Sequence, residues 1–485
     1  MEGMRCMIGR KEEREYLLSL INEDEPQFVA VFGRRRIGKT YLVRESFEHK
    51  FTFQHTGISN NQIEPGTRKM AQLNKFAESL KEAGYKGNDK LDSWNDAFNA
   101  LKEVIKESNQ KKKVIFIDEL SWMDTKDSGL ISALESFWNG WVTARAEKDV
   151  ILIVCASATY WMIKNIVNAK GGLHNRLTGQ IYLKPFTLHE CEEYMESRKI
   201  IFNRHQILQC YMIMGGIPYY WSLLKKGKSL PQNIDNLFFK EGAPLSNEYE
   251  NLYSALFNKP GQYMKIVEAL STVNKGITRD EISEITGISS SGDLTRKLTE
   301  LENCGFIRKY VPFGYKQKNS LYQLIDNYTL FYYKFLRDNV HNDDYWKELS
   351  NTPAVRAWSG IAFERVCLEH TAQIKSALGI SGVYTEINAW QCGKDEDKGI
   401  MGSQIDLLIV RKDQVINICE MKYSETEYMV DAKFDRDQKR KISDFLKKTE
   451  TKYAIHSTLI TTYGVEDNSY SGDIQAVITS DDLFA

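Results

Sequence analysis

Short apolar runs alternate with stretches of helical periodicity in the first half of the chain. The apolar runs cover residues 28–32, 114–117 and 150–155, and buried strands of a parallel sheet have this composition. Residues 51–110 are polar and helical in character, with four large apolar residues at helical spacing: Trp94, Phe98, Leu101 and Ile105. The pattern predicts an α/β domain whose parallel sheet is covered by helices.

The first apolar run ends directly in a phosphate-binding loop. The complete G-x-x-x-x-G-K-[ST] pattern consists of Gly33, Arg34, Arg35, Arg36, Ile37, Gly38, Lys39 and Thr40, and Tyr41 opens the helical stretch that follows. Glycines allow the backbone N–H groups to turn inward and cradle phosphate oxygens at a helix N-terminus. Lys39 would reach the β- and γ-phosphates, and the Thr40 hydroxyl would ligate Mg²⁺. The loop, including Tyr41, therefore predicts a site for ATP and Mg²⁺.

The second apolar run ends in two carboxylates, Asp118 and Glu119. A strand that ends in this pair, downstream of a phosphate loop, is a Walker B arrangement. Asp118 would hold Mg²⁺ through water, and Glu119 would polarise the attacking water. The alternative is a pair of surface carboxylates.

The third apolar run is followed by hydroxyl side chains, and an arginine lies farther along. Ser157 or Thr159 would sense the γ-phosphate, or would cap the strand end. Arg176 would act as an arginine finger on a neighbouring subunit, or is an ordinary solvated arginine. The first role for Arg176 requires a homo-oligomer.

From Pro260 onward the pattern changes to three helices and a hairpin. Helices are expected over 262–270, 278–286 and 290–304, and short strands over 305–310 and 321–324. This order predicts a winged helix-turn-helix. Its basic residues are Arg296, Lys297, Arg308, Lys316 and Lys318. These would contact DNA phosphates, or the fold would be an internal packing module, since acidic residues dilute the basic face.

The last third of the chain has the D…E-x-K spacing of PD-(D/E)XK nucleases. Asp406 lies in one predicted strand, and Glu420 and Lys422 lie in the next. Residues two apart on a strand project from the same face, so a hairpin would bring all three together, and Glu364 lies on a preceding helix. Asp406 and Glu420 would hold Mg²⁺ while Lys422 activates water and stabilises charge on the phosphate. A basic helix over 433–448 would follow a phosphate backbone or is simply solvated.

Several of these motifs together resemble the archaeal-type ATPase family, close to the AAA+ and STAND branches of P-loop NTPases. The motifs are Ile8-Gly9-Arg10, the loop from Gly33 to Thr40, Ile115-Phe116-Ile117-Asp118-Glu119, Cys155-Ala156-Ser157-Ala158, Leu183-Lys184-Pro185-Phe186 and Gly215-Gly216-Ile217-Pro218-Tyr219-Tyr220. The resemblance implies that Arg10, Gly216 and Pro218 border the adenine. It also implies a C-terminal domain similar to the nuclease fold.

Length and composition limit the functional classes. The chain has 485 residues, too many for one core, and a formal net charge of −1, so attraction to DNA would have to come from local patches. The eight cysteines show no zinc-ligand spacing, and no signal peptide or membrane-spanning run is present, which favours a cytoplasmic protein that does not bind membranes.

We expect a P-loop ATPase domain (1–225), a helical linker (226–259), a winged helix (260–340) and a small α/β restriction-endonuclease-like domain (345–485). The expected function is an ATP-hydrolysing switch that binds ATP and ADP and acts on DNA. The alternatives are an ATPase regulator or adaptor that binds DNA or protein without cleaving, and a non-catalytic nucleotide-bound interaction protein.

Overall fold

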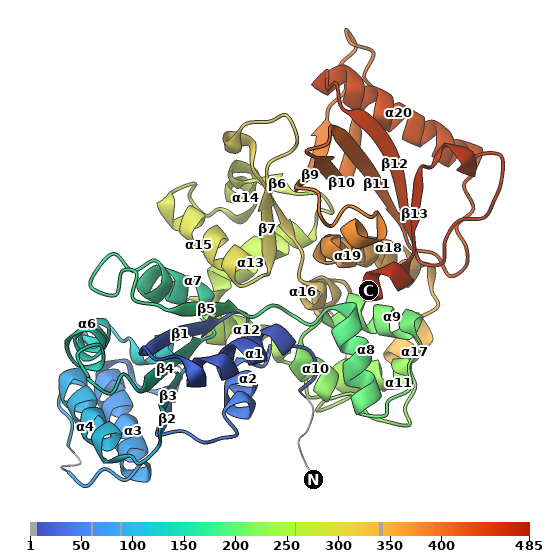
Figure 1. Cartoon of the computed structure of the whole chain (residues 1–485). Coiled ribbons are helices and arrows are strands. Elements are labelled where there is room, and N and C mark those ends of the chain that lie inside the picture. Colours follow the sequence, from blue (N-terminus) through green and yellow to red (C-terminus); the bar gives the residue numbers. More distant parts are fainter. Residues whose placement is uncertain (1–6, 60–61, 88–89, 258, 339–342) are drawn as a thin grey trace. The chain divides into compact units, whose positions relative to one another are not determined.

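Five parallel strands form the first sheet of the protein in the computed structural model (Figure 1), in the order β2-β3-β4-β1-β5. The strands are β1 (Gln27–Phe32), β2 (Phe53–Thr56), β3 (Lys113–Asp118), β4 (Val150–Ala156) and β5 (Gly179–Tyr182). The three predicted apolar runs are the three central strands. The strand β2 was missed in the segment interpreted as helical, because only two of its four residues, Phe53 and His55, are buried.

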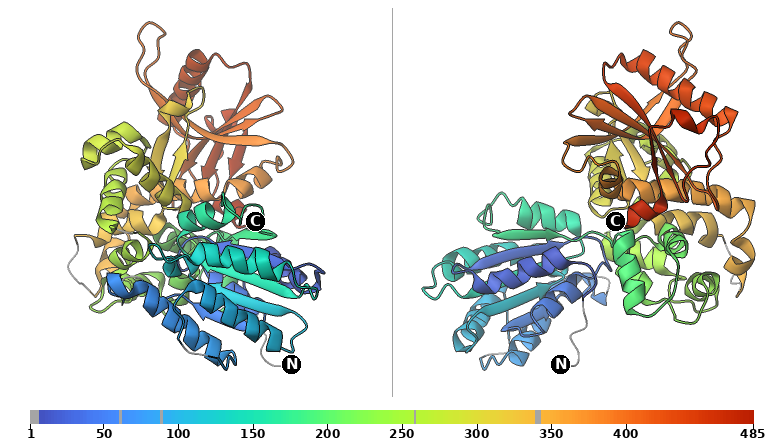
Figure 2. Two further views of the ribbon diagram at one scale, coloured as in Figure 1. Left: turned by 90° about the vertical axis from the view of Figure 1, so that its left-hand side faces the viewer. Right: turned by 45° about the vertical axis from the view of Figure 1, so that its right-hand side comes forward.

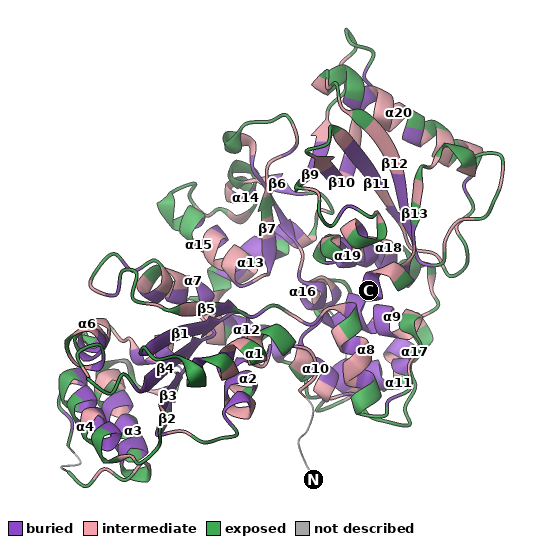
Figure 3. Ribbon diagram, in the orientation of Figure 1, coloured by how far each residue is buried: buried purple, intermediate pink, exposed green. Residues whose placement is uncertain are grey.

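Helices cover both faces of this sheet (Figure 2). The helices are α1 (Lys11–Ser19), α2 (Lys39–Ser46), α3 (Arg68–Glu82), α4 (Trp94–Glu107), α5 (Leu120–Met123), α6 (Leu130–Phe137) and α7 (Thr159–Met162). Alternate strand residues such as Phe28, Ile115 and Leu152 join one core with the buried faces of α3, α4 and α6. The central strands are buried along their whole length (Figure 3), and this rigid layer positions the loops at the carboxyl ends of the strands.

The structure describes residues 7–59, 62–87, 90–257, 259–338 and 343–485. These fall into two compact units. The first consists of the chain up to Pro185 together with Asn251–Pro260, and the second consists of Phe186–Glu250 and Gly261–Ala485. The three domains and the helical linker expected from the sequence remain a prediction about independent folding, because two of those regions and parts of the other two share the second unit.

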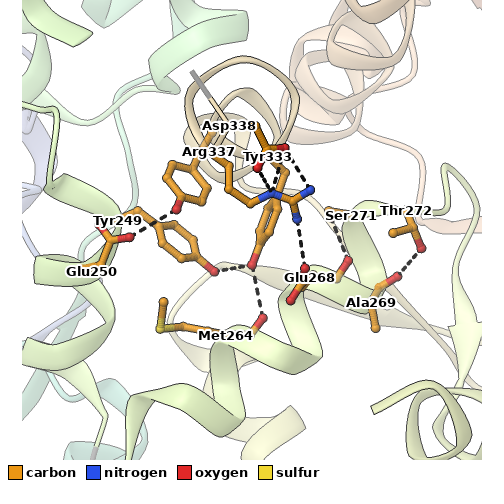
Figure 4. A network of polar contacts seen from close by, with 11 residues as sticks. Tyr249, Glu250, Met264, Glu268, Ala269, Ser271, Thr272, Tyr333, Arg337 and Asp338 are labelled. Carbon is orange, nitrogen blue, oxygen red and sulfur yellow. Dashed lines mark hydrogen bonds and ion pairs between the residues drawn. The ribbon is translucent and has the colours of Figure 1, made fainter. Parts of the chain in front are cut away.

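The second unit begins with helices that follow the first sheet in the sequence. They are α8 (Leu188–Ser197), α9 (Arg204–Met214), α10 (Pro218–Ser222), α11 (Leu230–Ile234) and α12 (Glu248–Leu256), the last of which continues into the first unit. Tyrosines anchor the start of α12 (Figure 4): the Tyr249 and Tyr333 hydroxyls lie 2.6 Å apart, and the Tyr249 ring stacks on Tyr332 at 3.9 Å. Tyr332 also donates to Glu250. These contacts hold the first turn of α12 within the second unit.

A three-helix segment with a small antiparallel sheet follows. Its elements are α13 (Pro260–Ser271), β6 (Ile277–Thr278), α14 (Arg279–Thr286), α15 (Gly292–Asn303), β7 (Ile307–Tyr310) and β8 (Leu321–Leu324), with sheet order β6-β8-β7. Thr278 caps α14 through a capping box with Glu281, and Gly287 ends that helix in the left-handed conformation. The helices and hairpin lie where the sequence predicts them. After β8 the chain continues in α16 (Asn327–Phe331), which is extended by a π-helical turn over Tyr332–Leu336.

The last part of the chain is a five-stranded sheet in the order β13-β12-β11-β10-β9. Its strands are β9 (Thr385–Cys392), β10 (Ser403–Arg411), β11 (Val415–Lys422), β12 (Ala454–Thr461) and β13 (Ala476–Ile478). Its helices are α17 (Tyr345–Leu349), α18 (Pro353–Glu369), α19 (Thr371–Ala377) and α20 (Ala432–Thr449). The hairpin β10-β11 is antiparallel, whereas β11 and β12 are parallel and joined through α20. Phe445 of α20 packs on Trp390, Leu408 and Ile418, which fixes α20 against one face of this sheet.

Among the described helices, none has both the length and the apolar content needed to cross a bilayer. Seven of the eight cysteines lie in the described residues, and all seven are free thiols. Cys6 lies outside the described residues.

Candidate functional site

The phosphate loop connects β1 to α2, as its sequence predicts. Gly33 and Gly38 have φ values of 144° and 90°, which side chains with a Cβ rarely adopt. A Cβ on Gly33 would also collide with the carbonyl oxygen of Leu183. Both glycines are therefore required by the backbone, and Gly38 places the first turn of α2 directly behind the loop.

Lys39 is turned into the loop. Its side chain is buried, and Nζ donates to the carbonyl oxygens of Gly33 (3.0 Å) and Arg34 (2.9 Å) and to Ser157 Oγ (3.1 Å). Ser157 Oγ in turn donates to Glu119 Oε1 at 2.6 Å, and Ser157 N donates to Glu119 Oε2 at 3.2 Å. One hydroxyl thus joins the lysine of the loop to the second Walker B carboxylate.

Thr40 and Asp118 form the second connection between the two motifs. Thr40 Oγ1 donates to Asp118 Oδ2 at 2.6 Å, and Glu119 N donates to Asp118 Oδ1 at 2.9 Å. Burial and the neighbouring Glu119 raise the pKa of Asp118, although its contacts with Thr40 and Lys39 oppose this. A divalent cation beside these oxygens would remove the cost of the buried charge.

This oxygen pair fits Mg²⁺. Mg²⁺ is usually bound by one or two protein oxygens and completes its octahedron with phosphates and water. Thr40 and Asp118 supply one hydroxyl and one carboxylate at the end of the phosphate loop. Glu119 has a left-handed backbone (φ 51°, ψ 42°), uncommon for a residue with a side chain. Such conformations cluster at functional sites.

The structure distinguishes the hydroxyls of Ser157 and Thr159, which the sequence left as alternative sensors of the γ-phosphate. Ser157 contacts both Lys39 and Glu119, whereas Thr159 Oγ1 is buried without a hydrogen-bond partner among the residues that the structure describes. Arg176 is exposed in the segment before β5.

The remaining residues predicted around the nucleotide lie in varied surroundings. Arg10 is buried and donates to the carbonyl oxygen of Lys184. Arg34 and Ile37 are buried, Arg35 and Arg36 are half-buried, and Tyr41 is exposed. Pro218 opens α10 in the second unit.

The second unit brings the predicted carboxylates and lysine of the nuclease motif into one electrostatic cluster. Burial raises the pKa of Glu364 to about 7, and the charges of Asp406 and Glu420 contribute, whereas Arg365 and Lys422 act in the opposite direction. Glu364 comes from α18, Asp406 from β10, and the other two motif residues from β11. The hairpin β10-β11 and α18 therefore gather the residues that the spacing predicted.

Both oxygens of Glu420 are occupied by ammonium groups. Lys422 Nζ lies 2.9 Å from Oε1, and Lys441 Nζ of α20 lies 2.7 Å from Oε2. Burial alone would raise the pKa of Glu420, but these two lysines outweigh it and lower the pKa. Asp406 Oδ1 accepts a hydrogen bond from Gln404. In the described parts of the chain, no group of three or more His, Cys, Asp or Glu side chains is placed to hold a metal ion.

Two arginines, the buried Arg365 and the half-buried Arg308, interact electrostatically with this cluster. Arg365 is 1% exposed, and it donates to the carbonyl oxygens of Leu324 (3.1 Å) and Asn274 (2.5 Å) and lies 3.8 Å from Glu364. Burial and the charge of Arg365 lower the pKa of Arg308 to about 10, although Asp406 and Glu364 oppose this. Both guanidinium groups therefore contribute positive charge to the electrostatic environment of the carboxylates.

Three of the five cations expected on a DNA-binding face instead contact other side chains of the protein. Arg296 pairs with Asp293 and Glu300, and Lys297 is 3% exposed and pairs with Asp293. Arg308 donates to Gln323. Lys316 and Lys318, at the hairpin turn, are exposed, and Arg296 is exposed as well but paired with its neighbours. The helix α15 therefore carries less free positive charge than its sequence indicates.

Sequence reasoning missed the contact of Lys441 with Glu420 and the placement of Arg365 and Arg308. Lys441 was included in a basic helix, and its spacing from Glu420 carries no motif. Only the packing of α20 on the sheet, through Phe445, brings it to the carboxylate.

Comparisons with known proteins agree with the first site. A family described as an ATPase domain predominantly from Archaea matches residues 7–224. An uncharacterized protein of Methanocaldococcus jannaschii is 24% identical over 452 residues, which cover 91% of this chain and 92% of that protein. A short uncharacterized ATP-binding protein of the same organism is 40% identical over 50 residues, which cover 10% of this chain and 85% of that protein. Among solved structures, the Walker-type ATPase of Pyrococcus abyssi is 14% identical with a TM-score of 0.45, and the match covers 67% of this chain and 96% of that one.

Proposed function

We propose that the protein is a molecular switch that binds and hydrolyses ATP, since residues 7–224 match a family described as an ATPase domain predominantly from Archaea. One observation carries the proposal: the two nucleotide motifs are joined by direct hydrogen bonds, through Thr40 to Asp118 and from Lys39 through Ser157 to Glu119. Such a connected set can change when a γ-phosphate arrives or leaves.

The residues of the nucleotide site have separate roles in binding and hydrolysing ATP. The backbone from Gly33 to Gly38 cradles the phosphates, and Lys39 exchanges its carbonyl contacts for the β- and γ-phosphate oxygens. Thr40 and Asp118 hold Mg²⁺, which neutralises charge on the phosphates when bound. Glu119 accepts the proton of the attacking water. Ser157 donates to Glu119, and this hydrogen bond holds that carboxylate in place.

Two variants test this division. Glu119→Gln keeps the shape of the side chain but removes the base, so we expect ATP to bind while kcat falls about 100- to 10,000-fold. Lys39→Ala removes a phosphate contact, so we expect weaker ATP binding and no measurable turnover. The matched control is Lys50→Ala, because Lys50 is an exposed lysine that pairs with Glu48 on the surface. Wild-type ATPase rates in Lys39→Ala would refute the assignment.

Three further residues complete the proposal for the nucleotide. Arg10 and Pro218 border the adenine, as the family resemblance implies. Arg176 acts as a finger on the nucleotide of a second copy, and its exposure leaves it accessible to that copy. ATPase activity that rises with protein concentration, and a loss of that rise in Arg176→Ala, would support a trans role. A monomer with full activity would refute it.

A second function is favoured by the carboxylate cluster. We propose that residues 260–336 form a winged helix and that the C-terminal sheet is a nuclease-like domain that engages DNA. Glu364, Asp406, Glu420 and Lys422 come from the helix and hairpin that such a site needs, and the exposed Lys316 and Lys318 offer phosphate contacts. A divalent cation on Asp406 and Glu420 requires Lys441 to release Glu420 first, because both oxygens of Glu420 are occupied.

Incubation of the protein with supercoiled and linear DNA, with Mg²⁺ or Mn²⁺ and with or without ATP, tests this second function. Cleavage that disappears in Lys422→Ala would establish a nuclease. DNA binding without cleavage in both proteins would favour an adaptor whose C-terminal domain binds without cutting. The exposed Lys412, which lies over the Tyr384 ring, provides the matched control variant Lys412→Ala.

A further inference from the structure

The match to the ATPase family ends at a different residue from the first segment of the first compact unit. The family match extends to residue 224, but the first unit ends at Pro185, and residues 186–224 pack with the C-terminal half. The helices α8 and α9 therefore belong to the ATPase domain by sequence and to the second unit by packing. A segment that belongs to the ATPase domain by sequence and to the second unit by packing is suited to transmit the nucleotide state.

The chain segment Leu183–Phe186 directly connects the phosphate loop to these helices. At its start, Leu183 N donates to Phe32 O at 2.8 Å, and the Leu183 carbonyl lies so close to Gly33 that no Cβ fits there. Three residues later, Phe186 N donates to Gly216 O at 2.6 Å, and Phe186 O accepts from Tyr211 of α9 at 2.8 Å. A displacement of the loop would thus reach α9 through four consecutive residues.

At its other end, α9 contacts Tyr423 through two side chains. His205 Nε2 and the Tyr423 hydroxyl lie 3.1 Å apart, and Gln209 Nε2 donates to the same hydroxyl at 3.3 Å. The rings of His205 and Tyr423 stack at 5.7 Å with an angle of 24°. His205 and Gln209, which lie one helical turn apart, therefore both contact the phenol of Tyr423.

Tyr423 directly follows Lys422 at the end of β11. Successive side chains of a strand point to opposite faces: Glu420 and Lys422 point toward α20, where Glu420 meets Lys441, and Tyr423 points toward α9 and packs on Phe363 of α18. A shift of the phenol would move the backbone that carries Lys422.

We infer that Tyr423 is a positioning residue through which α9 transmits the nucleotide state to the strand carrying Glu420 and Lys422. This route runs through the ATPase domain itself and needs no movement of the winged helix. The inference rests on the proposed function only in that ATP must bind the phosphate loop.

Hydrogen–deuterium exchange of the full chain, with and without Mg²⁺ and a non-hydrolysable ATP analogue, tests this inference. The peptide covering residues 415–425 reports the strand, and the peptide covering 33–46 reports the phosphate loop. In the wild type we expect the analogue to slow exchange of both peptides, with an effect on the strand of about fivefold, the low end of coupling between two sites.

Tyr423→Phe removes only the hydroxyl that His205 and Gln209 contact and leaves the ring in place. We expect normal protection of the loop peptide and loss of the strand response. His205→Phe, which keeps a stacked ring, should have the same effect. The matched control is Tyr463→Phe: Tyr463 also stacks on His205, at 5.3 Å, but its hydroxyl is not part of the contact. This control should respond as the wild type does.

The possible failures are distinguishable. A strand response that persists in Tyr423→Phe, or a wild type whose loop is protected while its strand is not, would overturn the inference and leave ATP binding intact. A wild type without protection of the loop would overturn the proposed function and the inference with it.

Discussion

The two candidate sites of this protein are built in different ways. The nucleotide site consists of a backbone loop and two strand ends, and its side chains are joined by direct hydrogen bonds, such as Thr40 to Asp118 at 2.6 Å. The carboxylate cluster consists of side chains from α18, β10, β11 and α20, and its main contacts are ion pairs, with Glu420 between two lysines.

This difference has a consequence for how each site responds to change. Hydrogen bonds in a buried loop have one geometry, so removal of one group should disrupt the whole nucleotide site. Ion pairs among half-buried groups depend on the charge of each neighbour, so the second site should respond to pH and to single charges. Three variants test this contrast, in order of decreasing effect.

The largest effect is expected in the nucleotide site. Ser157→Ala removes the hydroxyl that joins Lys39 to Glu119, and we expect kcat for ATP to fall about 10- to 100-fold, as for other residues that orient a reacting group, with a smaller change in KM. Steady-state ATPase kinetics measure both. Thr159→Ala is the matched control, because its hydroxyl is equally buried but contacts neither residue. Equal losses in both variants would mean that the site depends on packing and not on this hydroxyl.

The same contrast explains what the sequence could predict. A phosphate loop is local: eight consecutive residues determine its backbone, and the strand β1 before it is buried along its whole length. The pairing of the loop with Asp118 and Glu119 followed from the Walker B motif downstream of the loop, and in a parallel sheet the carboxyl ends of the strands lie at one edge. These predictions needed no knowledge of side-chain packing.

The carboxylate cluster could be predicted only in part. Glu420 and Lys422 were linked by the period of a strand, and Asp406 by a hairpin, both of which are local rules. Lys441 reaches Glu420 only because α20 crosses back over the sheet. Arg365, on α18, interacts with carbonyl oxygens far away in the sequence, including that of Asn274. No spacing rule includes such contacts.

The cations of α15 show a second limit of sequence reasoning. A helix that carries Arg296 and Lys297 appears basic when its charges are counted. Because Asp293 lies three and four residues before them, it faces both, and the structure pairs all three. The spacing of opposite charges on a helix therefore provides more information than their number.

The second-largest effect is expected at Glu364. Burial raises the pKa of its carboxyl group to about 7. Its folded pKa exceeds the unfolded value, so its contribution to stability is fully present below the unfolded pKa, near 4.3, and is lost as pH rises through about 7. Because the side chain is partly exposed, we expect a loss on the order of 1 kcal/mol between pH 5 and 8. Urea unfolding of the wild type and of Glu364→Gln at both pH values measures it.

Glu364→Gln cannot ionise, so its unfolding free energy should fall less over this range than that of the wild type. The difference between the two proteins isolates Glu364 from all other groups. Glu369→Gln provides a control on the same helix. Identical pH dependence in the wild type and Glu364→Gln would show that Glu364 does not make the carboxylate cluster sensitive to pH, and the contrast would fail.

The smallest effect concerns Lys441. Its ammonium lies 2.7 Å from Glu420, so Lys441→Met should free one carboxylate oxygen and strengthen Mn²⁺ binding about fivefold, the value of roughly 1 kcal/mol for such a pair. Isothermal titration with Mn²⁺ in the absence of nucleotide measures it. Lys439→Met is the matched control, since Lys439 lies on the same helix and pairs with Asp435 and Asp473 but not with Glu420. If Mn²⁺ affinity falls in Lys441→Met, Lys441 supports the cation and does not compete with it, and the cluster is a preformed site like that of the phosphate loop.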